Sequence, residues 1–242
     1  LSSSNSSAKN ILPFWIHSLS TFPFLTNHLD LFSRIETCLN QLETKQVESL
    51  IQATTQLMPD YPTQSKEILG SIESSANLFT KGSLASAIPK IYSYDPEFTL
   101  SILDWLLIDP DQNTCVLATA ALGFIIRSNR EAYYLRAPIV IQHGNQKALQ
   151  ILVNNSIRDY LNYDITDKIN ILPDLWIKCN ETSRSKLVSY ICEQGKLSPT
   201  SFIDTATRIF NKDTKSFSDL HRWIGMRDTD LQKKLIEIKT KI

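Results

Sequence analysis

The residues with the strongest capacity for recognition chemistry lie between positions 127 and 158. They are Arg127, Arg130, Tyr134 and Arg136, followed by Lys147, Asn154 and Arg158. Arginine and tyrosine are frequent hot-spot residues of protein interfaces, and arginine equally binds phosphates. The last three, with Gln150, step by three or four residues, as side chains on one helical face do. We predict a partner-binding site here; the alternative is a solvated helix face beside core tyrosines.

Motifs of the common enzyme classes are missing from the sequence. It has no GxGxxG, GxxxxGK[ST], GxSxG, HExxH or EF-hand pattern. His17 and His28 flank Pro23 without a third metal ligand, and His221 follows Asp219 by two residues, which places the two on different helix faces. We therefore expect a protein that is not an enzyme and that uses no metal or cofactor.

The four cysteines, Cys38, Cys115, Cys179 and Cys192, are far apart and form no CxxC pair. This spacing argues against a zinc site and against a disulfide scaffold. We expect reduced thiols in helical cores and a cytoplasmic protein. No uninterrupted apolar run approaches the roughly 18 residues of a membrane span, so we expect no membrane partner.

Charge is balanced over the chain but not along it. Lys and Arg number 25, as do Asp and Glu. Residues 1–121 carry 6 basic and 12 acidic side chains, whereas residues 122–242 carry 19 basic and 13 acidic ones. The balance gives no general attraction to nucleic acid or to an acidic membrane. The asymmetry allows self-association through oppositely charged ends, or it is a chance difference between solvated faces.

The elements that must position these residues are helices. Apolar residues recur at helical spacing almost everywhere after residue 28, and the chain has only six glycines, which disfavours glycine-rich turns and phosphate loops. Asp95-Pro96 and Ser198-Pro199 each place a capping oxygen before a proline at the first helical position. Thr63, Asn129 and Asp164 are weaker cap candidates, and Gly195 is a predicted helix stop.

The helix starts recur at an interval near 34 residues. The first helix of each predicted hairpin begins near residues 28, 64, 96, 130, 165 and 199. Two-helix units of this length stack into solenoids, because one hairpin cannot bury its apolar face alone. We predict an all-α fold, a right-handed α-solenoid of about six antiparallel hairpins. The expected organisation is a linker or disordered tail at 1–10 and a single domain at 11–242, with an irregular cap at 11–27.

One hairpin, residues 96–127, resembles a HEAT repeat. The stretch from Asp109-Pro110-Asp111 to Ala121-Leu122-Gly123-Phe124-Ile125 matches the family's second helix, which runs from an Asp-Pro-Asp turn to Ala-Leu-Gly-x-Ile. Thr114 and Cys115 depart from the usual Val-Arg, and the other hairpins match poorly, so tetratricopeptide-like repeats remain an alternative. The resemblance implies a scaffold that holds a protein, a peptide or nucleic acid on a concave face.

These features together predict a non-enzymatic protein- or peptide-binding scaffold or sensor domain. The serine-rich start without an initiator Met suggests a piece of a larger protein. The alternative is a HEAT-like domain that binds or processes nucleic acid through its basic C-terminal half. Self-association through the charged ends is the third hypothesis.

Overall fold

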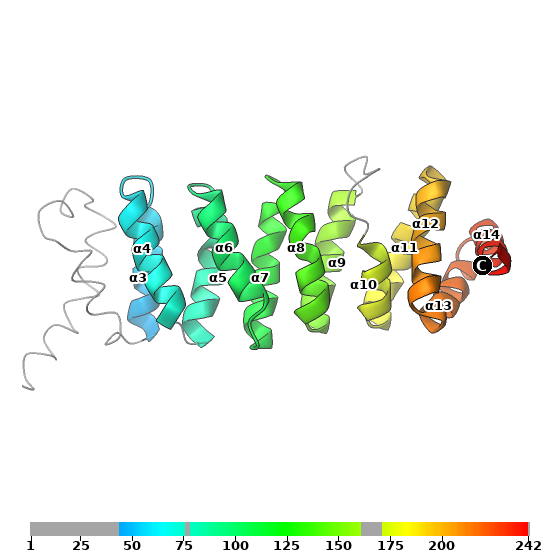
Figure 1. Ribbon diagram of the computed structural model, residues 1–242, viewed down its shortest axis with the longest axis horizontal. Helices are drawn as coiled ribbons and strands as arrows, with labels where there is room; N and C mark the ends of the chain where they lie inside the picture. Colours follow the sequence, from blue (N-terminus) through cyan, green and yellow to red (C-terminus); the bar gives the residue numbers. More distant parts are fainter. Residues whose placement is uncertain (1–43, 76–77, 161–170, 242) are drawn as a thin grey trace, which may run out of the picture. The chain divides into compact units, whose positions relative to one another are not determined.

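The structure is a computed structural model that describes residues 44–75, 78–160 and 171–241 (Figure 1). These residues form twelve α-helices and no strand, which confirms the prediction of an all-α protein. The chain divides into two compact units, Leu1–Ala121 (unit 1) and Leu122–Ile242 (unit 2). The predicted tail at 1–10 and cap at 11–27 lie outside the described residues.

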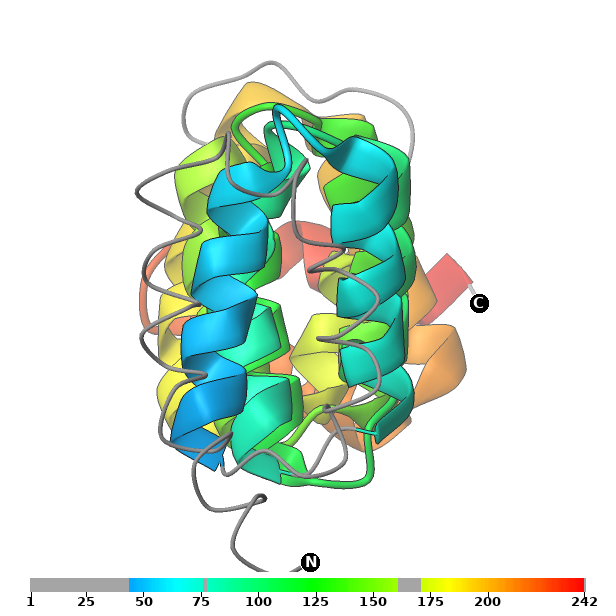
Figure 2. The ribbon, with the colours of Figure 1, turned by 90° about the vertical axis from the view of Figure 1, so that its left-hand side faces the viewer.

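Unit 1 is built from helices α3 to α7. They are α3 (Thr44–Leu57), α4 (Pro62–Ser75), α5 (Leu78–Tyr92), α6 (Pro96–Leu107) and α7 (Gln112–Ile125), the last of which ends in unit 2. Helix α3 packs against α4 and α5, and α5 packs against α6. Figure 2 shows α3 and α5 in one layer and α4 and α6 in the other. The layers bury the apolar stripes, including Ile51, Ile72 and Ile102.

Side-chain caps fix the start of the helices in the hairpin formed by α6 and α7. Asp95 accepts a hydrogen bond from the Phe98 amide at 3.0 Å, and Pro96 occupies the first turn of α6, as predicted. Asp111 accepts from both the amide and the hydroxyl of Thr114 at the start of α7. The buried Asp109 accepts from the Asp111 amide and pairs with Lys81 of α5. The Asp-Pro-Asp turn thus ties its own hairpin to the preceding helix.

Unit 2 holds the remaining helices. They are α8 (Arg130–His143), α9 (Gln146–Tyr160), α10 (Leu172–Lys178), α11 (Glu181–Leu197), α12 (Pro199–Lys212), α13 (Thr214–Gly225) and α14 (Thr229–Lys241). Helices α9, α11 and α13 pack side by side in one layer, and α8, α10, α12 and α14 form the other. Buried residues of both layers, such as Tyr133, Trp176 and Phe202, make the core.

Several predicted boundaries need correction. Ser198 precedes α12 as predicted but makes no capping bond to the helix backbone. Thr63 lies inside the first turn of α4, which begins at Pro62. Gly195 does not end its helix, because α11 continues to Leu197. Gly195 is buried, and Leu231 packs so closely against it that a Cβ there would lie 2.9 Å from the leucine methyl carbons. Asn129 caps α8 as predicted, through the Ala132 amide. Asp164 and the starts near 28 and 165 lie outside the described residues.

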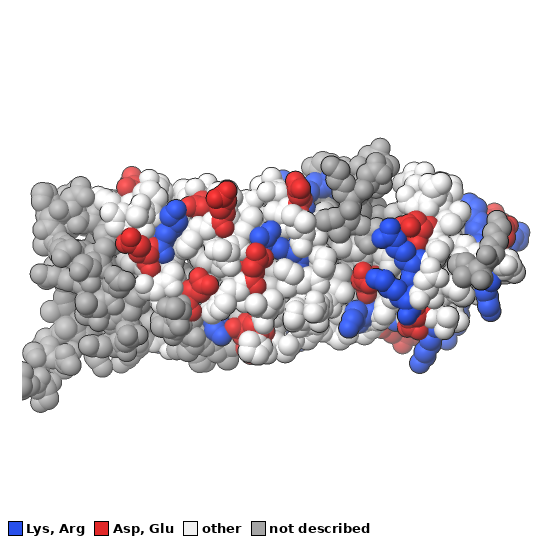
Figure 3. All heavy atoms as spheres, in the orientation of Figure 1, with Lys and Arg blue, Asp and Glu red and all other residues white. Residues whose placement is uncertain are grey.

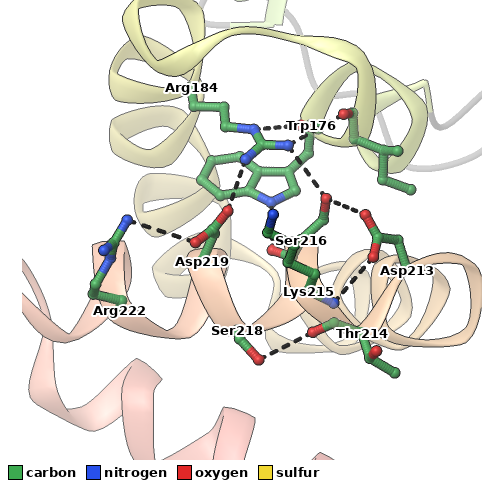
Figure 4. Close-up of polar contacts among 10 residues, drawn as sticks. Trp176, Arg184, Asp213, Thr214, Lys215, Ser216, Ser218, Asp219 and Arg222 are labelled. Carbon is green, nitrogen blue, oxygen red and sulfur yellow. Dashed lines mark hydrogen bonds and ion pairs between the residues drawn. The ribbon is translucent and has the colours of Figure 1, made fainter.

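A polar network centred on Arg184 ties three helices of unit 2 together (Figure 4). The guanidinium of this α11 residue donates to the backbone carbonyls of Trp176 and Ile177 at the end of α10. It also bonds Asp219 and the Ser216 hydroxyl of α13, at 2.9 and 3.2 Å. The Trp176 indole donates to the Ser216 carbonyl at 2.8 Å. Every partner is internal, so this arginine has a structural role.

Candidate binding surfaces

Unit 1 carries an open groove of about 690 Å³ across helices α3, α5 and α7. It was not predicted from the sequence. Its floor comes from buried or half-buried residues such as Ile51, Thr55 and Ala87. Its walls carry polar and charged side chains from all three helices: Glu48, Gln52, Gln56, Ser83, Ser86, Lys90 and Asn113. The groove therefore presents hydrogen-bonding groups around a partly apolar floor.

The lining residues follow the helical repeat. Glu48, Gln52 and Gln56 step by four along α3, and Gly82, Ser86 and Lys90 step by four along α5. Such residues share one helix face and rise by about 6 Å per step. The helical spacing of apolar residues after residue 28 predicts a helix here, whose buried residues include Val47, Leu50 and Ile51, but the polar row beside them was not predicted. That row is the signal that could have located the groove.

Most of the polar groups in the walls are not used inside the protein. Among the described residues, the side chains of Gln52, Gln56 and Asn113 make no hydrogen bond, and those of Glu48 and Lys90 make no ion pair. Ser83 and Ser86 differ: the Ser86 hydroxyl donates to the Gly82 carbonyl, and Ser83 also has an interaction within the protein. Side-chain amides in an open groove can replace their hydrogen bonds to water with hydrogen bonds to a ligand, and no hydrogen bond within the protein has to break. The groove thus has three wall amides that make no hydrogen bond within the part of the chain that the structure describes.

Charge and shape vary along this groove. The acidic side chain, Glu48, lies near the N-terminal end of α3. The basic side chain, Lys90, lies in the last turn of α5. Leu117 of α7 is 43% exposed and lies close to Gly82, where a Cβ would be 3.2 Å from its Cδ1 atom. The missing side chain at Gly82 thus makes room for Leu117, which offers an apolar contact within the polar walls.

The first part of the predicted site, Arg127 to Arg136, lies before and on α8. Arg127 is exposed and Arg130 half-buried at the start of the helix. Arg136 is half-buried and donates to the Ala132 carbonyl of its own helix at 3.2 Å. Tyr134 is only 8% exposed and packs edge-on against the Tyr133 ring, so it belongs to the core and not to the surface. Burial of Tyr134 removes it as a surface anchor.

The second part lies on α9, in the other layer of unit 2. Lys147 is exposed, and Asn154 accepts a hydrogen bond from Lys186 of α11 at 3.0 Å. The side chain of Arg158 lies outside the described residues. The predicted set is therefore divided between α8 and α9, and sequence reasoning did not include Lys186, the residue of α11 that the fold brings to Asn154. A role of these residues in binding stays a prediction.

The described residues were also searched for metal ligands, for reactive cysteines and for membrane-spanning helices. Over 44–75, 78–160 and 171–241, no group of three His, Cys, Asp or Glu residues could hold a metal ion. Cys115, Cys179 and Cys192 are free and buried, as predicted, and burial raises the pKa of the Cys179 thiol to about 11. Cys38 lies outside this part of the chain. None of the helices described has the length and apolar character needed to cross a bilayer.

Compared with protein-family models, curated proteins and solved structures, the chain matches none. The HEAT-like character of residues 96–127 therefore stays a prediction from its motif residues. Evidence about function comes from the chain's own surfaces.

Proposed function

We propose that this protein is a non-enzymatic polypeptide-binding domain and that the groove across α3, α5 and α7 is its binding site. In this proposal the helices form a right-handed α-solenoid of antiparallel hairpins within a larger cytoplasmic scaffold or sensor. One observation carries the proposal: an open groove whose wall amides make no hydrogen bond among the described residues. Such groups are available for a partner.

The groove's chemistry favours an extended segment as its ligand. An amphipathic helix satisfies its own backbone and needs an apolar groove, whereas an extended segment needs partners for its amides and carbonyls. Gln52 and Gln56 offer both donors and acceptors, and their spacing of about 6 Å is close to the two-residue repeat of about 6.6 Å in an extended chain. Leu117 and the small residues of α5 would then contact side chains on the segment's other edge.

Peptide selection followed by a matched pair of variants tests this proposal. Random peptides displayed on phage are selected on the immobilised full chain, and enriched peptides are synthesised with a fluorophore. Ser86→Trp fills the groove from α5, whereas Ser101→Trp places the same bulk on the exposed face of α6. Both serines are exposed, and each hydroxyl donates to a carbonyl of its own helix. We expect the enriched peptides to bind wild type and Ser101→Trp, and to bind Ser86→Trp at least tenfold more weakly.

Two results would contradict the groove as the binding site. One is a selection that enriches no peptide. The other is a set of peptides that bind Ser86→Trp as tightly as wild type while both variants retain the wild-type melting curve, because a tryptophan at residue 86 cannot leave the groove unchanged.

Nucleic-acid binding is the alternative, and the excess of basic residues in unit 2 supports it. Residues 122–242 carry 19 basic and 13 acidic side chains. Phosphate contacts make affinity fall steeply with salt. A fluorescent duplex that binds at low salt with such a slope would favour this alternative, and a duplex that does not bind would eliminate it.

Self-association is supported by the opposite net charges of the two compact units. Unit 1, which has net charge −6, and unit 2, which has net charge +6, divide the chain at the point where the charge changes sign. Contact between unlike ends of two copies is heterologous and builds open chains unless it closes. Light scattering should then show mass rising with protein concentration and falling with salt. A constant monomer mass would exclude it.

A further inference from the structure

We propose that unit 2 has a second binding surface, a basic strip across α9 and α11 that takes an acidic segment of a polypeptide. The basic strip consists of Lys147, Lys186 and Arg227, with Asn154 and Ser189 between them. This surface lies outside the groove of unit 1, so the inference does not depend on the function proposed for the groove.

Hydrogen bonds between elements fix two of the three cations. Lys186 of α11 donates from Nζ to the Asn154 side chain of α9 at 3.0 Å. Arg227, in the turn between α13 and α14, donates to the Ser189 hydroxyl and, at 3.3 Å, to the Ser185 carbonyl of α11. Lys186 thus reaches from α11 to α9, and Arg227 reaches α11 from the turn before α14. Lys147 lies on α9 seven residues before Asn154, which is two turns along the same face.

The partners of Lys186 and Arg227 are neutral, so their charge is not compensated. Other cations of unit 2 pair with carboxylates: Lys212 with Asp174 at 2.6 Å, Arg208 with Asp204 at 3.0 Å and, on α11 itself, Arg184 with Asp219 at 2.9 Å and Lys196 with Asp228 at 3.4 Å. Figure 3 shows this arrangement over α10 and α12, where Lys and Arg lie beside Asp and Glu. Lys186 of α11 and Arg227 beside it instead bond amide, hydroxyl and carbonyl oxygens. These two exposed cations therefore leave positive charge on this surface.

The same strip disfavours a uniform polyanion. Glu193 is exposed and follows Lys186 by seven residues, so it lies on the same face of α11. A nucleic acid with phosphates at regular spacing would bring one of them near this carboxylate. A polypeptide can place carboxylates opposite the cations and a neutral or basic residue opposite Glu193, so we assign the strip to an acidic polypeptide segment.

A binding experiment with a short fluorescein-labelled oligoglutamate peptide, whose glutamates are interrupted by serines so that a neutral residue can lie opposite Glu193, tests the assignment on the full chain. A duplex DNA with the same label serves as the competing probe. The double variant Lys186→Gln/Arg227→Gln removes two charges from the strip, and Arg208→Gln/Lys212→Gln removes the same net charge from α12. We expect wild type and the α12 variant to bind the peptide, and the strip variant to bind it about tenfold or more weakly, which corresponds to about 1.4 kcal/mol.

Two further variants keep the test decisive. If the strip variant melts below wild type, Lys147→Gln replaces it, since Lys147 is exposed, and we expect a several-fold loss. Ser86→Trp alters only the groove and should bind oligoglutamate like wild type, which separates the two surfaces. Equal losses in both double variants would show a general effect of net charge and overturn the proposal. So would a wild-type chain that binds duplex DNA in preference to oligoglutamate, or neither probe.

Discussion

The guanidinium of Arg184 lies over the indole of Trp176, with its central carbon 5.3 Å from the ring centroid. The tryptophan is fully buried, and the arginine side chain is 17% exposed. The same guanidinium bonds the carboxylate of Asp219, which in turn lies near Arg222 at 3.5 Å. A cation, a ring and a carboxylate from three helices thus hold α10, α11 and α13 in register.

Arg184→Lys should therefore destabilise unit 2 even though it keeps the charge. Lysine cannot reproduce the planar fork that bonds two backbone carbonyls, Ser216 and Asp219 together. Loss of these part-buried hydrogen bonds should cost about 1 to 3 kcal/mol. Urea unfolding followed by circular dichroism measures the change. Arg208→Lys, in the exposed pair with Asp204, is the control and should cost less than about 0.5 kcal/mol. Equal costs would show that the network adds nothing.

Much of the fold could be predicted because it depends on local signals. The apolar spacing indicated helices throughout, and Asp95-Pro96 and Asn129 marked two helix starts through their own caps. Leu231, Leu235 and Ile238, which recur at helical spacing, are buried in α14. Each of these signals acts within a few residues, so the sequence carries it without knowledge of the packing.

What could not be predicted depends on residues far apart in the chain. Gly195 has the local character of a helix stop, but Leu231 and Phe202 determine its role by packing against its Cα. Tyr134 was expected on a surface, and packing buries it. The groove and the basic strip arise where helices with about 30 intervening residues come together, as Lys186 does with Asn154. Helical spacing identifies a face but not its neighbour.

Gly195→Ala should destabilise the protein, against the usual effect of this change in a helix. Alanine in place of glycine normally stabilises a helix interior by about 0.5 to 1 kcal/mol. At Gly195 the new Cβ would lie 2.9 Å from both Leu231 methyl carbons and 3.1 Å from Phe202, so the core must shift. Gly70→Ala in α4, where nothing lies within 4 Å, should stabilise. Thermal melts of the two variants should move in opposite directions, and a rise for both would refute the close packing.

Leu122→Ala tests the burial of helix α7. Leu122 is fully buried, so its truncation should cost roughly 2 to 5 kcal/mol through lost contacts and a cavity. The matched control is Leu135→Ala on α8, since Leu135 is 57% exposed and should lose less than about 1 kcal/mol. Chemical unfolding of both variants supplies the comparison. A cost at residue 122 below about 0.5 kcal/mol would contradict its place in the core.

The cap at Asp95 should make stability depend on pH in the acid range. The hydrogen bond from the Phe98 amide, and then that from Lys66, holds the pKa of this carboxyl below its ordinary value. A lowered folded pKa contributes stability that is present above the unfolded pKa, about 3.9, and is lost as pH falls through the folded value. Asn also caps helices but carries no charge. The free energy of unfolding of wild type should thus exceed that of Asp95→Asn at neutral pH. At acid pH the free energies of the two proteins should converge. If the difference between the two free energies were the same at every pH, ionisation of Asp95 would not contribute to stability.

Three buried thiols should be protected from reagents until the chain unfolds. Burial raises the pKa of Cys179 to about 11 and also raises the pKa values of Cys115 and Cys192. A raised thiol pKa means that the thiol of the folded protein loses its proton at a higher pH than the same thiol in the unfolded chain. The stability that comes from this difference is therefore present below about pH 9 and falls as pH rises toward the folded pKa.

A Cys38→Ser variant leaves only these three thiols for a labelling experiment. Near pH 8, Ellman's reagent should react with them only at the rate at which the protein unfolds. In urea, all three thiols should become reactive together if unit 2 and α7 unfold cooperatively. A thiol that reacts at once in the native protein would show that its helix opens locally, and substituting each cysteine in turn would identify it.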